Sequence, residues 1–248
     1  MNETASIAPP ATDSSMADAV ERAVQQRHSC RGFRPDPVPR TLIERILRIS
    51  QSTPSWCNSQ AWQLVVTEGQ ATRDFRTALF AEASRRMADP GADQGAPDFP
   101  TPERYDGIYA ERRRACGLAL YQSLGIARED RAGAARAMLN NFDLFGAPHV
   151  MIVTTPRDLG PYGAVDCGGF VSTFMTVAQA HGVATIAQGA LATYSQFVRA
   201  HFGIGDDRLL LCGISFGYED SAAPANGFRT GRASLDEVVS WRTGAEAG

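Results

Sequence analysis

Residues 164–181 read AVDCGGFVSTFMTVAQAH, and this segment restricts the possible folds of the chain more than any other. Helical spacing here leaves no polar face, because almost every residue is small or apolar. A helix that is apolar all round has to be buried on every side. In a chain of 248 residues, we therefore expect a sheet on one side of this helix and a second subunit on the other.

Strands and helices alternate irregularly around this segment. Apolar, β-branched runs predict buried strands at residues 62–67, 149–154, 183–187 and 209–217. Apolar residues at helical spacing predict further helices at residues 16–26, 39–50, 71–87, 107–124, 129–140 and 195–201. The chain shows no internal repeat and no linker. It is therefore predicted to form one α+β domain over residues 16–248.

Composition excludes several classes of partner. The formal net charge is -3, which gives no reason to expect nucleic acid, and no apolar run approaches the length of a membrane span. Residues 1–15 are small and polar, lack the features of a secretory signal, and are expected to form a flexible arm. The 5 cysteines show no CxxC spacing, so neither disulfides nor a structural zinc site is expected. Together these features predict a cytoplasmic protein.

Other catalytic motifs are weak or missing. Residues 213–217 read GISFG and match the GxSxG motif of hydrolases. That motif requires a following helix and a later histidine, but the next residues are not helical and no histidine follows His201. The chain lacks GxGxxG and P-loop sequences, and its 4 histidines lack metal-binding spacing. We expect no metal and no protein nucleophile.

A basic cluster, Arg27-His28-Ser29-Cys30-Arg31, follows the first predicted helix. Arginines in such a position often cap the last carbonyls of a helix and remain in solvent. Alternatively, Arg27 and Ser29 grip a phosphate while Arg31 meets a delocalised anion, since guanidinium stays charged and binds bidentately. The cluster by itself favours the solvated alternative.

The cluster belongs, however, to a series of segments that resembles the FMN-dependent nitroreductase family. In order, they are RHSCRGF (27–33), PDPVP (35–39), TPSWCNSQAW (53–62), NFDLFGAP (141–148), QG (188–189) and GISFGYED (213–220). Asn226, Arg229 and Arg232 then resemble the family's closing segment. The pattern is most similar to a subgroup that reduces nitrobenzoates and other nitroaromatics, and the resemblance spans about residues 16–241.

The resemblance implies a nitroreductase-like fold, with a central mixed sheet flanked by helices, in an intertwined homodimer. Two FMN sites are implied at the subunit interface, with Ser55, Asn58 and Gln60 reaching the flavin from the partner subunit. Gln188 and Gly189 are implied to place backbone N–H groups near flavin N5. From the first subunit the resemblance implies these further FMN contacts: Arg27, His28, Ser29, Arg31, Arg229 and Arg232.

Three features of the sequence affect the expected flavin pocket. Ala61 stands where family members commonly have proline, which removes a fixed φ and predicts a less rigid loop. Trp56 replaces a small residue and would crowd or line the pocket. Residues 89–130 form a variable insert of the kind often used as a lid. Its aromatic residues Phe99, Tyr105 and Tyr109 either cover the substrate slot over the flavin or fill the core.

The implied activity is reduction of nitroaromatic compounds by NADH or NADPH through FMN, in a ping-pong cycle at one slot. The flavin does the chemistry, and Arg31 supports it electrostatically at the N1 edge. Two alternatives remain open. One is another FMN enzyme on the same fold: a dehydrogenase, an ene-type reductase or a reductive dehalogenase. The other is a flavin-binding protein without turnover.

Overall fold

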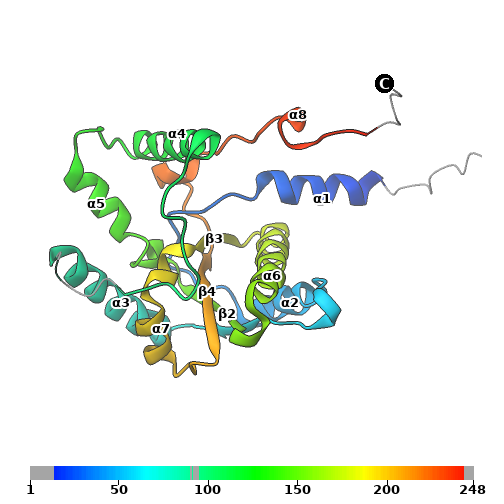
Figure 1. Cartoon of the computed structure of the whole chain (residues 1–248), viewed down its shortest axis with the longest axis horizontal. Coiled ribbons are helices and arrows are strands. Elements are labelled where there is room, and N and C mark those ends of the chain that lie inside the picture. The colour runs from blue at the N-terminus through cyan, green and yellow to red at the C-terminus, as the bar shows by residue number, and fades with distance from the viewer. Residues whose placement is uncertain (1–13, 90, 92–94, 243–248) are drawn as a thin grey trace, which may run out of the picture.

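The computed structural model describes residues 14–89, 91 and 95–242 (Figure 1). Its elements occur in this order: α1 (Ser14–Gln26), α2 (Arg40–Ser50), η1 (Trp56–Asn58), β1 (Gln63–Val66), α3 (Gln70–Ala88), α4 (Gly107–Ser123), α5 (Arg131–Leu139), η2 (Leu144–Gly146), β2 (His149–Pro156), η3 (Arg157–Leu159), α6 (Gly160–Ala180), β3 (Ala184–Gln188), η4 (Gly189–Tyr194), α7 (Ser195–Phe202), β4 (Arg208–Gly217), η5 (Pro224–Gly227) and α8 (Leu235–Val238). The predicted helices and strands are all present, and the α+β class is confirmed.

A four-stranded sheet in the order β1-β2-β4-β3 forms the centre of the molecule. All three strand pairs in it are antiparallel, so the predicted mixed sheet is wrong for the part of the chain that the structure describes. A parallel pairing appears there as an isolated bridge between Ser29 and Thr185. The long β4 pairs with β2 and β3, and its residues are buried almost throughout.

Helices cover both faces of the sheet. On one face α6 and α2 enclose a core in which Phe170 and Phe174 pack with Met151 and Ile214 of the strands. On the other face α3 and α7 lie against residues such as Ile152. Figure 1 shows these two layers on opposite sides of the strands. In the described ranges, no helix is both long and apolar enough to cross a membrane.

The apolar helix α6 begins at Gly160, four residues before its predicted start, because Pro161 is well suited to a first helical turn. Its sheet side is buried, as predicted. The opposite side carries Val165, Gly168, Gly169 and Ser172, all exposed in the single chain. The layer expected on that side is thus not supplied by the described residues of the same chain.

Helix α1 shows a second uncovered apolar stripe. Of the stripe predicted from its sequence, Ala23 is buried, whereas Val20 and Val24 are 57% and 54% exposed. Figure 1 shows α1 extending away from the main body of the molecule. The helix begins at Ser14, within the predicted arm, and residues 1–13 of that arm lie outside the described residues.

The predicted insert is anchored to α7 and β4 through Asp98. Asp98 is ion-paired with Arg199 of α7 and accepts a hydrogen bond from the Leu210 backbone N at 2.7 Å. Further along, Tyr105 and Tyr109 are exposed and Phe99 is half-buried. The two tyrosines therefore do not fill the core of this chain.

Candidate functional site

The basic cluster lies along the free edge of β3. Ser29 forms a parallel bridge with Thr185, and the Cys30 backbone N donates to the Thr185 carbonyl at 3.0 Å. These contacts fix the backbone beyond the end of α1. The cluster is consequently part of the sheet edge and not a loose helix end, and Arg27 and Arg31 are half-buried.

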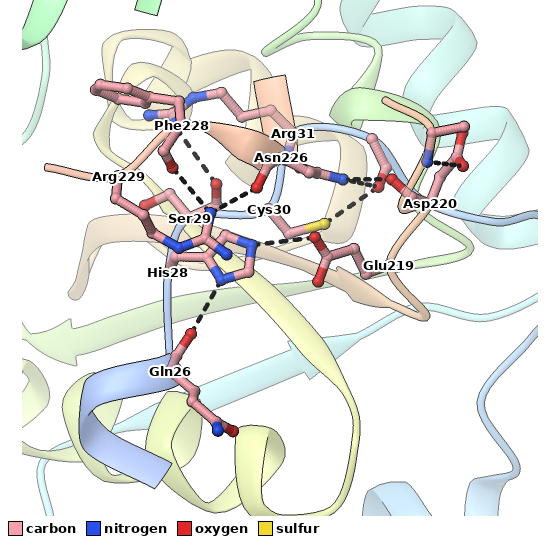
Figure 2. Close-up of polar contacts among 12 residues, drawn as sticks. Gln26, His28, Ser29, Cys30, Arg31, Glu219, Asp220, Asn226, Phe228 and Arg229 are labelled. Atoms are coloured by element: carbon pink, nitrogen blue, oxygen red, sulfur yellow. Dashed lines mark hydrogen bonds and ion pairs between the residues drawn. The ribbon is translucent and has the colours of Figure 1, made fainter. Parts of the chain in front are cut away.

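The C-terminal segment holds the cluster from the other side through Asn226 (Figure 2). Its side-chain Oδ1 accepts from the Arg31 backbone N at 2.7 Å, and its Nδ2 donates to the Gly32 carbonyl at 2.8 Å. The approach requires glycine, since a Cβ on Gly32 would lie 2.4 Å from the Ala223 Cβ. Sequence reasoning marked Asn226 as part of the closing segment but did not identify this contact.

A groove of about 660 Å³ opens between these two segments. Its residues come from the end of α1, the basic cluster and the C-terminal segment: Val24, Gln25, Gln26, Arg27, His28, Ser29, Arg31, Phe228, Arg229, Thr230 and Arg232. Six of the predicted site residues are thus brought together, although some 200 residues separate the two walls in sequence.

The groove is strongly positive. Among the described residues, no carboxylate forms an ion pair with Arg27, Arg31, Arg229 or Arg232. Burial and the nearby Arg232 charge lower the pKa of Arg27, and burial lowers the pKa of Arg31. Both shifts mark cations that would be stabilised by an anion between them.

His28 forms part of the groove wall and is oriented at both ring nitrogens. Nδ1 lies 3.0 Å from the Gln26 carbonyl and Nε2 lies 3.2 Å from Glu219 Oε1 (Figure 2). These two contacts fix the orientation of the ring. Glu219 was not anticipated as its partner.

Ser55, Asn58 and Gln60 do not line the groove of their own chain. Their loop has left-handed φ values of 55° at Asn58 and 47° at Gln60, which are uncommon outside glycine. Ser55 Oγ accepts from the Gln60 backbone N at 3.0 Å, and Gln60 Nε2 donates to Asn58 Oδ1 at 3.2 Å. The loop is therefore ordered but its polar groups face outward.

Asp166 anchors this loop to α6. One carboxylate oxygen accepts from the Trp56 backbone N at 3.0 Å and the other from Ser59 Oγ at 2.7 Å. The side chain is buried, which requires such partners. Sequence reasoning missed this role, although Asp166 is conspicuous as a lone carboxylate in the apolar segment 164–181.

Gln188 fixes the turn at the end of β3. Its Nε2 donates to the Asn141 carbonyl at 2.7 Å, and its Oε1 accepts from Ser215 Oγ at 2.5 Å. The side chain is thus structural, and a ligand would meet the backbone of the turn. A Cβ on Gly189 would meet no heavy atom within 4 Å, so space is open there. Ser215 lies buried within β4, which agrees with the rejection of a hydrolase.

Arg31 also lines a second hollow of about 140 Å³ on the far side of the cluster. Its other lining residues are mostly apolar and come from α4, α5, the η2 region and the C-terminal segment: Leu120, Tyr121, Leu124, Ala137, Met138, Asn140, Asn141, Phe145 and Ala225. The Arg31 guanidinium therefore stands between a charged groove and a largely apolar space.

The residues present fit a phosphorylated cofactor with a planar ring. The groove volume is within the usual range for ligand sites. Guanidiniums and a serine hydroxyl are suitable hydrogen-bond donors to the oxygens of a phosphate. The apolar space beside Arg31 suits the ring. No group of three or more potential metal ligands occurs in the described ranges, 14–89, 91 and 95–242.

Known proteins are similar to this chain in both sequence and fold. The model of the Nitroreductase family matches residues 24–218. Nitroreductase NfnB of Mycolicibacterium smegmatis is 36% identical over 226 residues, covering 90% of this chain and 93% of the relative. The 4-nitrobenzoate reductase of Pseudomonas putida is 33% identical, covering 88% and 92%. The crystal structure of FMN-dependent NfnB from Mycobacterium smegmatis in complex with NADPH has a TM-score of 0.85 at 34% identity, covering 92% of this chain and 99% of that one.

Proposed function

Because the chain belongs to the nitroreductase family, we propose that it is an FMN-dependent oxidoreductase that uses NADPH or NADH to reduce nitroaromatic compounds. The observation that carries the proposal is the groove with four arginines that have no carboxylate partner among the described residues. When bound, FMN would supply two-electron chemistry, by which hydride is transferred from a nicotinamide to a nitro group.

Different residues bind different parts of the cofactor. Arg27, Ser29, Arg229 and Arg232 hold the phosphate, since guanidinium and hydroxyl donors are strongest toward charged oxygens. His28 is held by Glu219 and the Gln26 carbonyl, so it orients the groove wall. These groups bind and orient the phosphate end of the cofactor. The ring of the cofactor lies at the Arg31 end of the cluster.

Arg31 and the β3 turn act on the ring. The Arg31 guanidinium stabilises negative charge that develops at the flavin N1 edge, and its backbone is held in place by Asn226. The backbone N–H groups at Gln188 and Gly189 would bind the N5 edge of the ring, while the Gln188 side chain holds the turn in place. The chain itself needs no nucleophile.

A second copy completes the site. Ser55, Asn58 and Gln60 face outward on a loop held by Asp166, so they are presented to the groove of a partner. The uncovered stripes on α1 and α6 are the surfaces that the partner buries. The pair is a homodimer, with residues 99–106 and α4 covering a small aromatic substrate at each site. The proposed location is the cytoplasm, where cysteines remain reduced, and the five free cysteines support it.

The visible spectrum of the purified protein tests this function. Oxidised FMN should be present, and anaerobic NADPH or NADH should bleach it. Adding 4-nitrobenzoate or nitrobenzene should then restore the oxidised spectrum. A protein without flavin contradicts the cofactor assignment. Bound flavin that neither nicotinamide bleaches favours a binding protein without turnover. Bleached flavin that only an enone or a halogenated aromatic reoxidises favours another reductase of this fold.

A further inference from the structure

Helix α4 carries three consecutive arginines with different surroundings. Arg112 is paired with Glu237 of α8, with Nη2 lying 3.3 Å from Oε1. Arg113 and Arg114 instead line a depression of about 590 Å³ together with Tyr105 and Tyr121. The remaining lining residues are small or apolar: Ala110, Gly117 and Leu118. The depression thus contains two guanidiniums and two phenol rings but no carboxylate.

The cations of the depression are available to a ligand. No carboxylate among the described residues forms an ion pair with Arg113 or Arg114. The guanidinium carbon of Arg113 lies 5.2 Å from the centroid of the Tyr105 ring, which holds the ring beside the charge. A matching ligand therefore combines a planar ring with one or more phosphates or carboxylates.

The depression is connected to the proposed flavin site through shared residues. Tyr121 lines both the depression and the apolar hollow, and Arg31 lines both that hollow and the groove. The three spaces therefore adjoin through shared residues, and α4 lines the depression and the hollow. At 1.5 Å of rise per residue, Arg113 and Tyr121 are about 12 Å apart along the helix axis. A ligand spanning this distance has to be elongated, with its two ends recognised separately.

We propose that Arg113 and Arg114 bind the phosphorylated adenosine of the nicotinamide donor and select NADPH over NADH. The adenine ring packs against Tyr105, the 2′-phosphate binds the two guanidiniums, and the nicotinamide end reaches the flavin ring beside Arg31. A nitroaromatic acid has the same ring-plus-anion chemistry, but it is too short to occupy both ends of this path. The inference rests on the proposed function, because it uses the same reduction site.

The reductive half-reaction tests the selection directly. Flavin bleaching by NADPH and by NADH is followed anaerobically in stopped flow for wild type, Arg113→Gln and Arg114→Gln. Each substitution should weaken NADPH at least about tenfold, because a hydrogen bond to a charged group is lost, and should leave NADH within about twofold. Arg112→Gln is the matched control and should change neither donor. Equal weakening of both donors, or no weakening, overturns the proposal.

Binding without turnover gives a second readout. Calorimetry compares adenosine 2′,5′-bisphosphate with adenosine 5′-monophosphate on the same proteins as purified. Wild type should prefer the bisphosphate, and both variants should lose that preference while retaining their fold. An unchanged preference contradicts the assignment, and so does a defect confined to 4-nitrobenzoate, which would make the depression a substrate site. Since this titration needs no electron transfer, a flavin-free protein would refute the proposed function and still decide this question.

Discussion

Arg31 differs from the other groove arginines because it borders two spaces of opposite character. Arg31→Ala should slow flavin reduction by at least about tenfold, since a preorganised charge beside the reacting ring is lost. Arg232→Ala should instead weaken FMN retention, because Arg232 faces Arg27 at the phosphate end. Stopped-flow rates and flavin content after dialysis separate the two effects.

Arg34→Ala is the control for this pair, because Arg34 is exposed and ion-paired with Asp36 at 2.8 Å. Arg34→Ala should change neither the rate of flavin reduction nor the flavin content after dialysis. A wild-type reduction rate in Arg31→Ala would show that this arginine is not the N1 partner. Full flavin content in Arg232→Ala after extensive dialysis would remove that residue from the phosphate site.

The site residues that sequence could predict are those with a local motif. Arg27, Ser29 and Arg31 fall in one short segment, and Arg229 and Arg232 in another. Their partners could not be found in this way, because Asn226 lies 195 positions from Arg31 and Asp166 lies 110 from Trp56. Such contacts depend on how the sheet brings distant segments together, which no short pattern contains.

The loop at residues 55–60 depends on a single carboxylate. In Asp166→Ala, the Trp56 backbone N and Ser59 Oγ lose their acceptor. The free energy of unfolding should fall by about 1–3 kcal/mol, the range for buried polar groups left unsatisfied. Thermal unfolding measures the loss, and limited proteolysis should cut the loop faster.

Asp158→Ala serves as the comparison, since Asp158 is exposed in the short η3 segment. It should alter the melting temperature and the cleavage rate little. If Asp166→Ala were as stable and as resistant as this control, the carboxylate would not be what anchors the loop.

The start of β2 makes stability depend on pH. His149 is buried, its Nε2 accepts from the Val38 backbone N at 2.9 Å, and its Nδ1 donates to the Thr67 carbonyl at 3.1 Å. Burial lowers its pKa from 6.5, although the Glu68 charge acts in the opposite direction. The unfolded chain then binds the proton more readily. The stabilisation is full above about pH 6.5 and is lost as the pH falls through the lowered value.

Thermal unfolding between pH 7.5 and pH 5.5 should therefore show a falling melting temperature. His149→Gln should be less stable at pH 7.5 by about 1–3 kcal/mol but should show a smaller change with pH. His181→Gln, at the half-exposed end of α6, should keep the wild-type slope. A wild-type slope in His149→Gln would assign the pH dependence to other groups.

Elements with strong local patterns were predictable, whereas their arrangement was not. The α6 segment was found because its composition permits only a buried helix, and α2 because Ile43, Ile46 and Ser50 recur at helical spacing. The antiparallel sheet was missed. Its direction depends on pairs such as Gln63 with Thr154, which are separated by about 90 residues in the chain. Local propensity carries no information about such a pairing.

The proposed dimer can be tested at Gly168, which lies on the uncovered side of α6. A Cβ there meets no heavy atom within 4 Å of the same chain, and leucine has a higher helix propensity than glycine. Gly168→Leu should therefore fold as a single chain yet fail to associate. Size-exclusion chromatography should show monomer, with loss of bound flavin.

Gly168→Ala is the matched control, because its side chain is small enough to leave close helix packing largely intact. It should remain dimeric and yellow. A dimeric Gly168→Leu protein with full flavin content would show that this side of α6 is not the subunit contact.

The two walls of the groove are separated by about 200 residues of chain, and this separation has a consequence for folding. Bringing such distant segments together costs loop-closure entropy and is slow compared with local structure formation. A partly folded chain therefore has no groove. A cofactor that binds only the complete form adds about 2.7 kcal/mol of stability at a hundredfold excess over its dissociation constant. Flavin content thus reports how much of a preparation has folded to completion, and cofactor supply during expression should raise that fraction.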